Sequence, residues 1–165
     1  MGVVGLTGRL RSGVGGLLLT GLLLLPAAAW GQAAGPGAAT LTIHVENVGP
    51  GGLVRLGLYD EAGYRDDKSK PIAFADVPAV PGETVIVLRN LRPGTYAIET
   101  YQDVNGNDKM DTTWLGLPLE PYGFSRDAEP FLSKPSFSRV KFAIHAGTQS
   151  QTVHLQNAAS DVASK

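Results

Sequence analysis

The chain has 165 residues, with 14 basic side chains, 15 acidic side chains and no cysteine. This length suits one domain, the near-neutral charge argues against a nucleic-acid-binding protein, and no disulfide can stabilise the fold. The hydrophobic core must therefore stabilise it, with or without the help of a metal ion.

Residues 1–33 have the pattern of a Sec-type signal peptide. Arg9 and Arg11 precede an uncharged apolar run, and small residues follow Pro26. The run is shorter than the roughly 20 apolar residues that span a bilayer, and no second run follows it. We expect cleavage rather than an uncleaved anchor, no transmembrane segment in the mature chain, and a periplasmic or secreted bacterial protein.

The mature chain divides into three parts. Residues 34–39 are rich in Gly, Ala and Pro, which predicts a flexible linker. The regular patterns lie within residues 40–157, where we expect a β-sandwich domain. Residues 158–165 have no apolar periodicity, which predicts a disordered tail.

The first half of the domain shows two clear strands. In residues 41–48 and 53–60 apolar side chains occupy every second position, which predicts strands buried on one face. The Gly-Pro-Gly-Gly segment at 49–52 predicts a turn, so we expect a hairpin. Residues 61–70 are charged and predict a solvated loop. Residues 71–81 contain three prolines and predict an irregular edge segment.

A third strand is predicted at residues 84–90, which are apolar and β-branched. A turn with Pro93 and Gly94 then leads into a strand that begins near Tyr96. This arrangement predicts a tyrosine corner, in which the phenol hydroxyl binds the backbone a few residues upstream. We therefore interpret these three residues as structural.

The second half is less regular. Residues 112–138 have no repeating pattern but hold five aromatic side chains, so we expect this long loop to pack on the domain. Alternation predicts closing strands at 139–147 and 151–157, and no stretch shows helical periodicity. Six or seven short strands predict an all-β Greek-key sandwich of immunoglobulin or transthyretin type.

An acidic loop follows the strand that begins near Tyr96. Its oxygen-bearing groups stand at relative positions 1, 3, 5, 7 and 9, as in a calcium-binding loop whose seventh residue supplies its carbonyl. Glu120 is the next acid downstream and would complete the ligand shell. The candidate Ca²⁺ ligands are Asp103, Asn105, Asn107, Lys109, Asp111 and Glu120. Asp108 stands where an EF-hand has glycine, and no helical pattern flanks the loop. A turn rich in Asn, Asp and Gly, without an ion, is the alternative.

Other residues offer weaker patterns. Three loop aromatics could stack on a sugar or line a pocket, or could instead cap the core; they are Trp114, Tyr122 and Phe124. The histidines lack zinc-site spacing and are interpreted as surface residues; they are His44, His145 and His154. Acid pairs that include Glu99, Glu120 or Glu129 could serve glycoside hydrolysis, although any chain with this many acids offers such pairs.

These patterns favour a non-enzymatic exported module with a structural calcium site. The first alternative is a module that binds a carbohydrate or another small ligand through the loop aromatics. A metal-dependent hydrolase is a second alternative. An adaptor that binds an envelope protein through an edge strand is a third.

Three motifs occur together in this chain: PGTYA at 93–97, DVNGND at 103–108 and GLPLEPYGFS at 116–125. With the KPSF and VKFAI segments that follow, they resemble the exported bacterial proteins grouped as domain of unknown function 2141. The resemblance covers roughly residues 41–155, and members often carry Gly where Asp108 stands. It implies a β-sandwich and export, and it ties Glu120 to the acidic loop. It implies no activity, because the family has none assigned.

Overall fold

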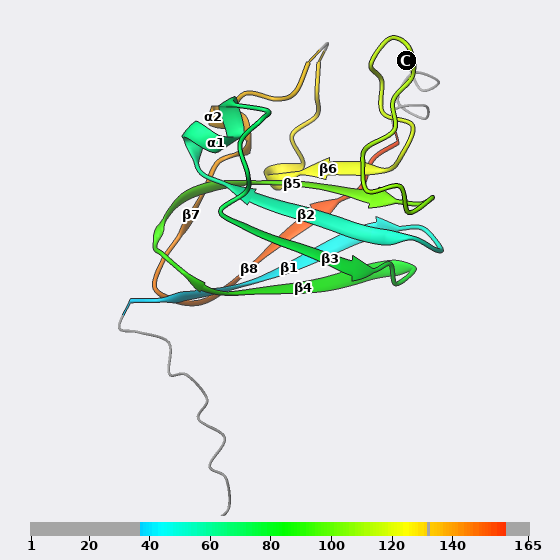
Figure 1. Cartoon of the computed structure of the whole chain (residues 1–165). Helices are drawn as coiled ribbons and strands as arrows, with labels where there is room; N and C mark the ends of the chain where they lie inside the picture. The colour runs from blue at the N-terminus through cyan, green and yellow to red at the C-terminus, as the bar shows by residue number, and fades with distance from the viewer. Residues whose placement is uncertain (1–36, 132, 158–165) are drawn as a thin grey trace, which may run out of the picture. The chain divides into compact units, whose positions relative to one another are not determined.

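The computed structural model describes residues 37–131 and 133–157, and its strands lie in two sheets (Figure 1). The predicted signal peptide, the first half of the predicted linker and the predicted tail lie outside the described residues. The prediction of an all-β class is confirmed, because strands form both layers and the helices that occur along the chain are short.

The first sheet has three strands in the order β4-β1-β8. They are β1 (Ala39–Val48), β4 (Gly82–Leu91) and β8 (Gly147–His154). The central strand β1 pairs antiparallel with β4 and parallel with β8. The predicted strand at 84–90 is therefore confirmed, and the predicted closing strand begins earlier than residue 151.

Four strands of the second sheet lie in the order β3-β2-β5-β6, and each pair of neighbouring strands is antiparallel. They are β2 (Leu53–Tyr59), β3 (Ala73–Pro78), β5 (Gly94–Asp103) and β6 (Tyr122–Phe124). A further short strand, β7 (Phe142–Ile144), pairs with the start of β5. β3 is an edge strand of this sheet, as the prolines of residues 71–81 indicated, although its pairing is regular.

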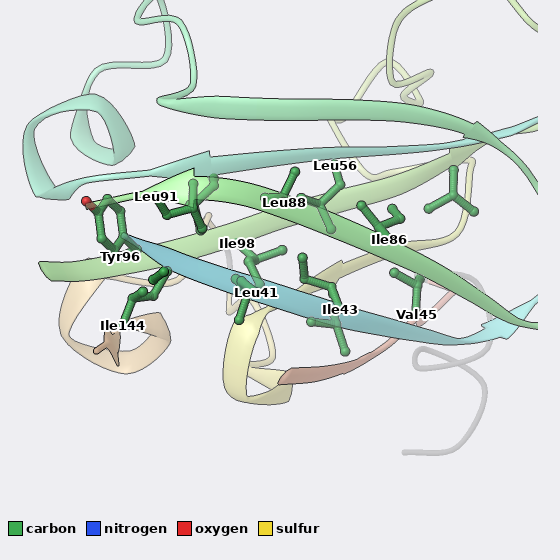
Figure 2. Packing of buried hydrophobic residues seen from close by; sticks show 14 of the residues in the cluster. Leu41, Ile43, Val45, Leu56, Ile86, Leu88, Leu91, Tyr96, Ile98 and Ile144 are labelled. Atoms are coloured by element: carbon green, nitrogen blue, oxygen red, sulfur yellow. The ribbon is translucent and has the colours of Figure 1, made fainter. Parts of the chain in front are cut away.

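The two sheets share one hydrophobic core, shown in part in Figure 2. Leu41, Ile43 and Val45 of β1 are fully buried and belong to the same cluster as Leu56 of β2 and Ile98 of β5. The buried faces predicted for the two first strands are thus confirmed. Burying each such side chain contributes about 1.5–3 kcal/mol, which explains how a domain without disulfides is held together.

The predicted hairpin between the two first strands is wrong. β1 pairs with β4 and β8, whereas β2 pairs with β3 and β5. The turn at 49–52 therefore carries the chain from one sheet to the other. Alternation reveals which face of a strand is buried, but it does not identify the neighbouring strand.

Short helices are present, although no stretch of the sequence shows helical periodicity. The described residues include α1 (Glu61–Arg65), the 3-10 helix η1 (Ser125–Asp127) and α2 (Phe137–Val140). All are too short to show helical periodicity in a sequence. Within the described ranges, no helix has the length and apolar character needed to cross a membrane.

The first helix changes the interpretation of the charged segment 61–70. The side chain of Asp60 caps α1 by accepting a hydrogen bond from Gly63 N at 2.8 Å. Tyr64 is buried, and its hydroxyl donates to the carbonyl of Pro135 at 2.8 Å. The segment is therefore anchored to the long loop rather than wholly solvated.

The strand predicted at 139–147 is correct only in its centre. Its first residues belong to α2, and only Phe142–Ile144 pair with β5. Val140 is buried as expected, but it is buried from a helix. An apolar residue every second position over so short a stretch does not distinguish a strand from one helical turn.

The turn before β5 has the geometry expected of a tyrosine corner. The hydroxyl of Tyr96 donates to the carbonyl oxygen of Arg92 at 2.9 Å. A side chain at Gly94 would lie 3.0 Å from the ring of Tyr96, so glycine leaves room for the ring to fold back over the turn. Pro93, which precedes Gly94 in the turn, is exposed.

Candidate ligand-binding groove and acidic loop

The outer face of the second sheet carries two rows of side chains across its strands. Pairing places Phe74 on β3, Gly57 on β2, Glu99 on β5 and Phe124 on β6 side by side. The second row consists of Asp76, Arg55, Tyr101 and Tyr122. Residues of β2 and β5 between these rows face the core, so the rows face away from it.

These rows form the floor of a groove of about 1330 Å³. One part of its wall comes from the loop residues Met110 and Leu115–Pro118, and another comes from Glu129, Pro130, Ser133 and Lys134. In Figure 1 both loops rise from the ends of β5 and β6, on the side of the sheet where α1 lies. The long loop thus shapes a cavity instead of only covering the core.

Gly57 sets the shape of the floor. A Cβ at this position would lie 2.6 Å from Cε2 and 2.9 Å from the hydroxyl oxygen of Tyr59. The ring of Tyr59 therefore lies over the glycine, within the row between Phe74 and Glu99. This glycine has an ordinary backbone conformation, and its role is to leave space for the aromatic ring.

Arg55 stands at the end of the groove that meets the acidic loop. Its Nε donates to Asp103 at 2.8 Å, one terminal nitrogen donates to Asp76 at 2.9 Å, and the other donates to Asp108. Only 14% of the side chain is exposed. Each of the three guanidinium nitrogens thus donates to a carboxylate, and the hydrogen bond to Asp103 with the charges of Asp76 and Asp108 raises the pKa of Arg55.

Asp103 organises the start of the acidic loop. Its carboxylate is fully buried and accepts hydrogen bonds from the backbone nitrogens of Gly106, Asn107 and Asp108 as well as from Arg55. Burial opposes ionisation, but these hydrogen bonds outweigh it and hold the pKa of Asp103 below its ordinary value.

Glu120 reaches the acidic loop, as the sequence predicted, through hydrogen bonds. Its two carboxylate oxygens accept from Val104 N at 2.9 Å and from Asp111 N at 3.1 Å. The side-chain amides of Asn105 and Asn107 donate to one oxygen of Asp111, at 2.6 and 2.9 Å. The loop therefore closes on itself, and Glu120 pins both of its ends.

The side chains of the other candidate calcium ligands thus come close together, whereas Lys109 was a candidate only through its backbone carbonyl. Lys109 is exposed, and its backbone nitrogen donates to the side chain of Asn107. Asp108 has φ 67°, the left-handed conformation for which an EF-hand uses glycine at this position. Within residues 37–131 and 133–157, no group of three or more His, Asp or Glu side chains has the spacing of a metal site.

The three aromatic candidates separate in the structure. Tyr122 and Phe124 line the groove, with ring centroids 6.1 Å apart in an edge-on arrangement. Trp114 is 91% exposed and is not part of the lining. Of the histidines, His44 contacts Glu83 and His154 contacts Asp127 and Glu46, which places both at the surface as ion-pair partners.

Lys134 fixes the far end of the groove. Its Nζ donates to Asp67 at 2.6 Å and to the carbonyl of Tyr64 at 2.7 Å, and it lies 4.4 Å from the centre of the Tyr64 ring. The same nitrogen is 3.1 Å from Oε1 of Glu99. This cluster joins α1, β5 and the loop, and it closes the floor.

Sequence reasoning did not identify most of this groove. The predictions gave no role to Arg55, Tyr59 or Tyr101, and Phe74 lies in the segment predicted as irregular. The available signal was the composition of that outward phase, which combines aromatic and charged residues where small polar ones are usual on a solvated face.

The fold and the groove define a class: an all-β domain of two sheets with a concave, aromatic-lined outer face. A family model described as an uncharacterized protein conserved in bacteria (DUF2141) matches residues 43–152, and the chain belongs to this family. No curated protein and no solved structure matches the chain.

Proposed function

We propose that this protein is an exported ligand-binding module whose binding site is the groove on the outer face of the second sheet. The observation that carries the proposal is the groove itself, because its floor presents Phe74, Tyr59 and Tyr101 beside charged groups. Binding sites for small molecules are concave, mostly apolar or aromatic, and contain a few polar groups that fix orientation. The module's export follows from the signal-peptide pattern of residues 1–33.

The groove suits a ligand that has both an apolar and a polar side. Leu115 and Leu117 of one loop and Pro130 of the other supply apolar wall, while Arg55 and Glu99 supply polar groups on the floor. A sugar ring or an aromatic ring could lie on the exposed face of Phe74. A small ligand of this kind agrees with the alternative that the loop aromatics suggested, with Phe74 in the place of Trp114.

The test is a pair of substitutions at exposed aromatic residues. Ligands are first found by NMR in a mixture of aryl glycosides, aromatic alcohols and aromatic amines. Phe74→Ala removes a groove side chain that is 70% exposed. It should weaken the binding of these ligands about tenfold, with little change in Tm. Trp114→Ala removes a still more exposed ring outside the groove and should leave affinity unchanged. Equal losses in both variants would contradict the proposed site.

We also propose that the 103–111 loop binds Ca²⁺ as a structural ion. The favouring observation is the left-handed conformation of Asp108 together with the hydrogen bond from its nitrogen to Asp103 at 3.0 Å, both of which suit a calcium-loop turn. Rotation of the Asn105 and Asn107 side chains would turn their oxygens toward the ion, which would replace their hydrogen bonds to Asp111.

Calcium at about 100 times its Kd should stabilise the domain by about 2.7 kcal/mol, which is a rise in Tm of several degrees. Asp111→Asn should abolish this rise. Asp66→Asn, which changes an exposed acid outside the loop, should preserve it. An unchanged Tm of the wild-type protein, together with no heat of calcium binding in calorimetry, would contradict the calcium proposal and leave the groove proposal intact.

We place the two sheets among Greek-key sandwiches of immunoglobulin or transthyretin type, again as a proposal. It is supported by the repeated crossing of the chain between the sheets and by the bond from the Tyr96 hydroxyl to Arg92.

A further inference from the structure

We propose that the groove selects organic cations, namely amines carried on an aromatic or aliphatic body, over neutral and anionic ligands of the same shape. This inference rests on the proposed ligand-binding function and names the chemistry of its ligand. It is carried by three observations: the carboxylate partners of Arg55 and Lys134, the excess of carboxylates in the lining, and the partly exposed carboxylate of Glu99 beside aromatic rings.

The first observation concerns Arg55, whose positive charge by itself would suit an anionic ligand. All three of its guanidinium nitrogens donate to carboxylates, those of Asp103, Asp76 and Asp108. Three negative charges surround one positive charge, so this end of the groove is negative overall. A ligand carboxylate or phosphate that approached the remaining N–H groups of Arg55 would be repelled by all three carboxylates.

Lys134 is committed in the same way at the other end. It donates to Asp67 and to the carbonyl of Tyr64, and it pairs with Glu99. Across the lining as a whole, the cations Arg55, Lys70 and Lys134 face four carboxylates, which are Asp76, Glu99, Asp108 and Glu129. Asp67 and Asp103 then contact two of those cations from outside the lining. The potential in the groove therefore favours a positively charged ligand.

Glu99 is the group that an amine would meet on the floor. Its Oε1 lies 3.1 Å from Nζ of Lys134, and 29% of its side chain is exposed in the lining of the groove. A ligand ammonium group that reaches the exposed part of this carboxylate would form a charge-assisted hydrogen bond with it. Burial raises the pKa of Glu99, and Lys134 opposes that rise.

Aromatic rings flank this carboxylate on both sides. Phe124 is its cross-strand neighbour on β6, and the ring of Tyr59 covers Gly57, its neighbour on β2. Phe74 lies one strand further along the same row. An aromatic face attracts a cation through its quadrupole, and a carboxylate attracts it by charge, so the two together suit an ammonium group whose carbon body rests on the rings.

The test compares three probes that share one ring and a similar chain length: phenethylamine, 2-phenylethanol and 3-phenylpropionate. Calorimetric titration of the whole protein at low ionic strength should give the tightest binding for the amine, about tenfold tighter than for the alcohol, and no binding for the acid. Added salt should weaken only the amine.

Two variants assign the preference to the groove. Glu99→Gln should reduce the amine-to-alcohol affinity ratio toward one, and a far-UV spectrum and Tm close to those of the wild type would show that the variant is folded. Phe74→Ala should weaken the amine and the alcohol in equal proportion and preserve their ratio.

The outcomes separate the two proposals. If the alcohol or the acid binds as tightly as the amine and Phe74→Ala weakens it, cation selection is overturned and the ligand-binding function stands. If none of the three probes binds, or if Phe74→Ala has no effect on those that do, both proposals are overturned.

Discussion

Gly52→Ala is expected to destabilise the domain by about 3 kcal/mol or more, the largest effect that we expect from any single methyl group. Gly52 has φ +76°, and a Cβ there would meet the backbone carbonyl oxygen of Asp103 and lie 2.8 Å from Cα of Val104. Both obstacles are backbone atoms, which cannot rotate away. The acidic loop would have to move with them, so the end of the groove near Arg55 should also change shape.

The neighbouring glycine provides the matched control. Gly51 has φ +82°, but a Cβ there would meet nothing within 4 Å. Gly51→Ala should therefore cost only the backbone strain, about 1 kcal/mol. Urea unfolding of both variants measures the difference. Similar losses would show that strand β2 and the loop do not approach each other as closely as described.

Asp103→Asn is expected to lower the Tm by about 10 °C. The new amide has the same shape, but its NH₂ group must face either Arg55 Nε with Asp108 N, or Gly106 N with Asn107 N, all of which are donors. No rotation of the side chain avoids this conflict. The loop should loosen, and ligand binding at the Arg55 end of the groove should weaken with it.

The control is a carboxylate on the same guanidinium. Asp76→Asn changes an exposed partner of Arg55 and should lower the Tm by about 2 °C or less. A loss as large as that of Asp103→Asn would contradict the role given to the buried carboxylate.

The pH dependence of the Asp103 effect has a definite sign. The folded-state pKa of Asp103 lies below the ordinary value of 3.8, so its stabilisation is complete above that value and is lost as pH falls through the folded-state pKa. The Tm difference between wild type and Asp103→Asn should therefore be constant near neutral pH and should shrink in acid. A difference that grows in acid would contradict this assignment.

Strand positions and buried faces were predictable because they depend on local pattern. Leu41, Ile43 and Val45 alternate with polar residues, and burial of one strand face requires that alternation. Which strands pair was not predictable in the same way. β1 pairs in parallel with β8, more than 100 residues later, and no local signal encodes such a contact.

The residues that meet in the acidic loop were predictable, but their hydrogen-bond partners were not. The spacing from Asp103 to Asp111 and the presence of Glu120 in the same motif indicated that these groups meet. No local pattern indicated that Arg55, on a distant strand, would donate a hydrogen bond to one oxygen of Asp103. Because the partner of a buried carboxylate is chosen by tertiary packing, an ion-binding loop and a hydrogen-bonded loop can share one pattern.

The groove was the least predictable feature. Its floor combines the outward residues of four strands, and the order of those strands was not available from the sequence. Gly57 illustrates the difficulty, since its absent side chain matters only because Tyr59 lies over it. A site built across a sheet becomes visible only when the strand order is known.

The most direct test of the central claim is chemical-shift mapping of the isotope-labelled protein during titration with phenethylamine. The account predicts saturable shifts at the backbone amides of the two outer-face rows, with Gly57, Glu99 and Phe124 among the largest, and no shifts for Thr42 or His44 on the first sheet. Shifts concentrated on the first sheet, or an unchanged spectrum at millimolar amine, would contradict it.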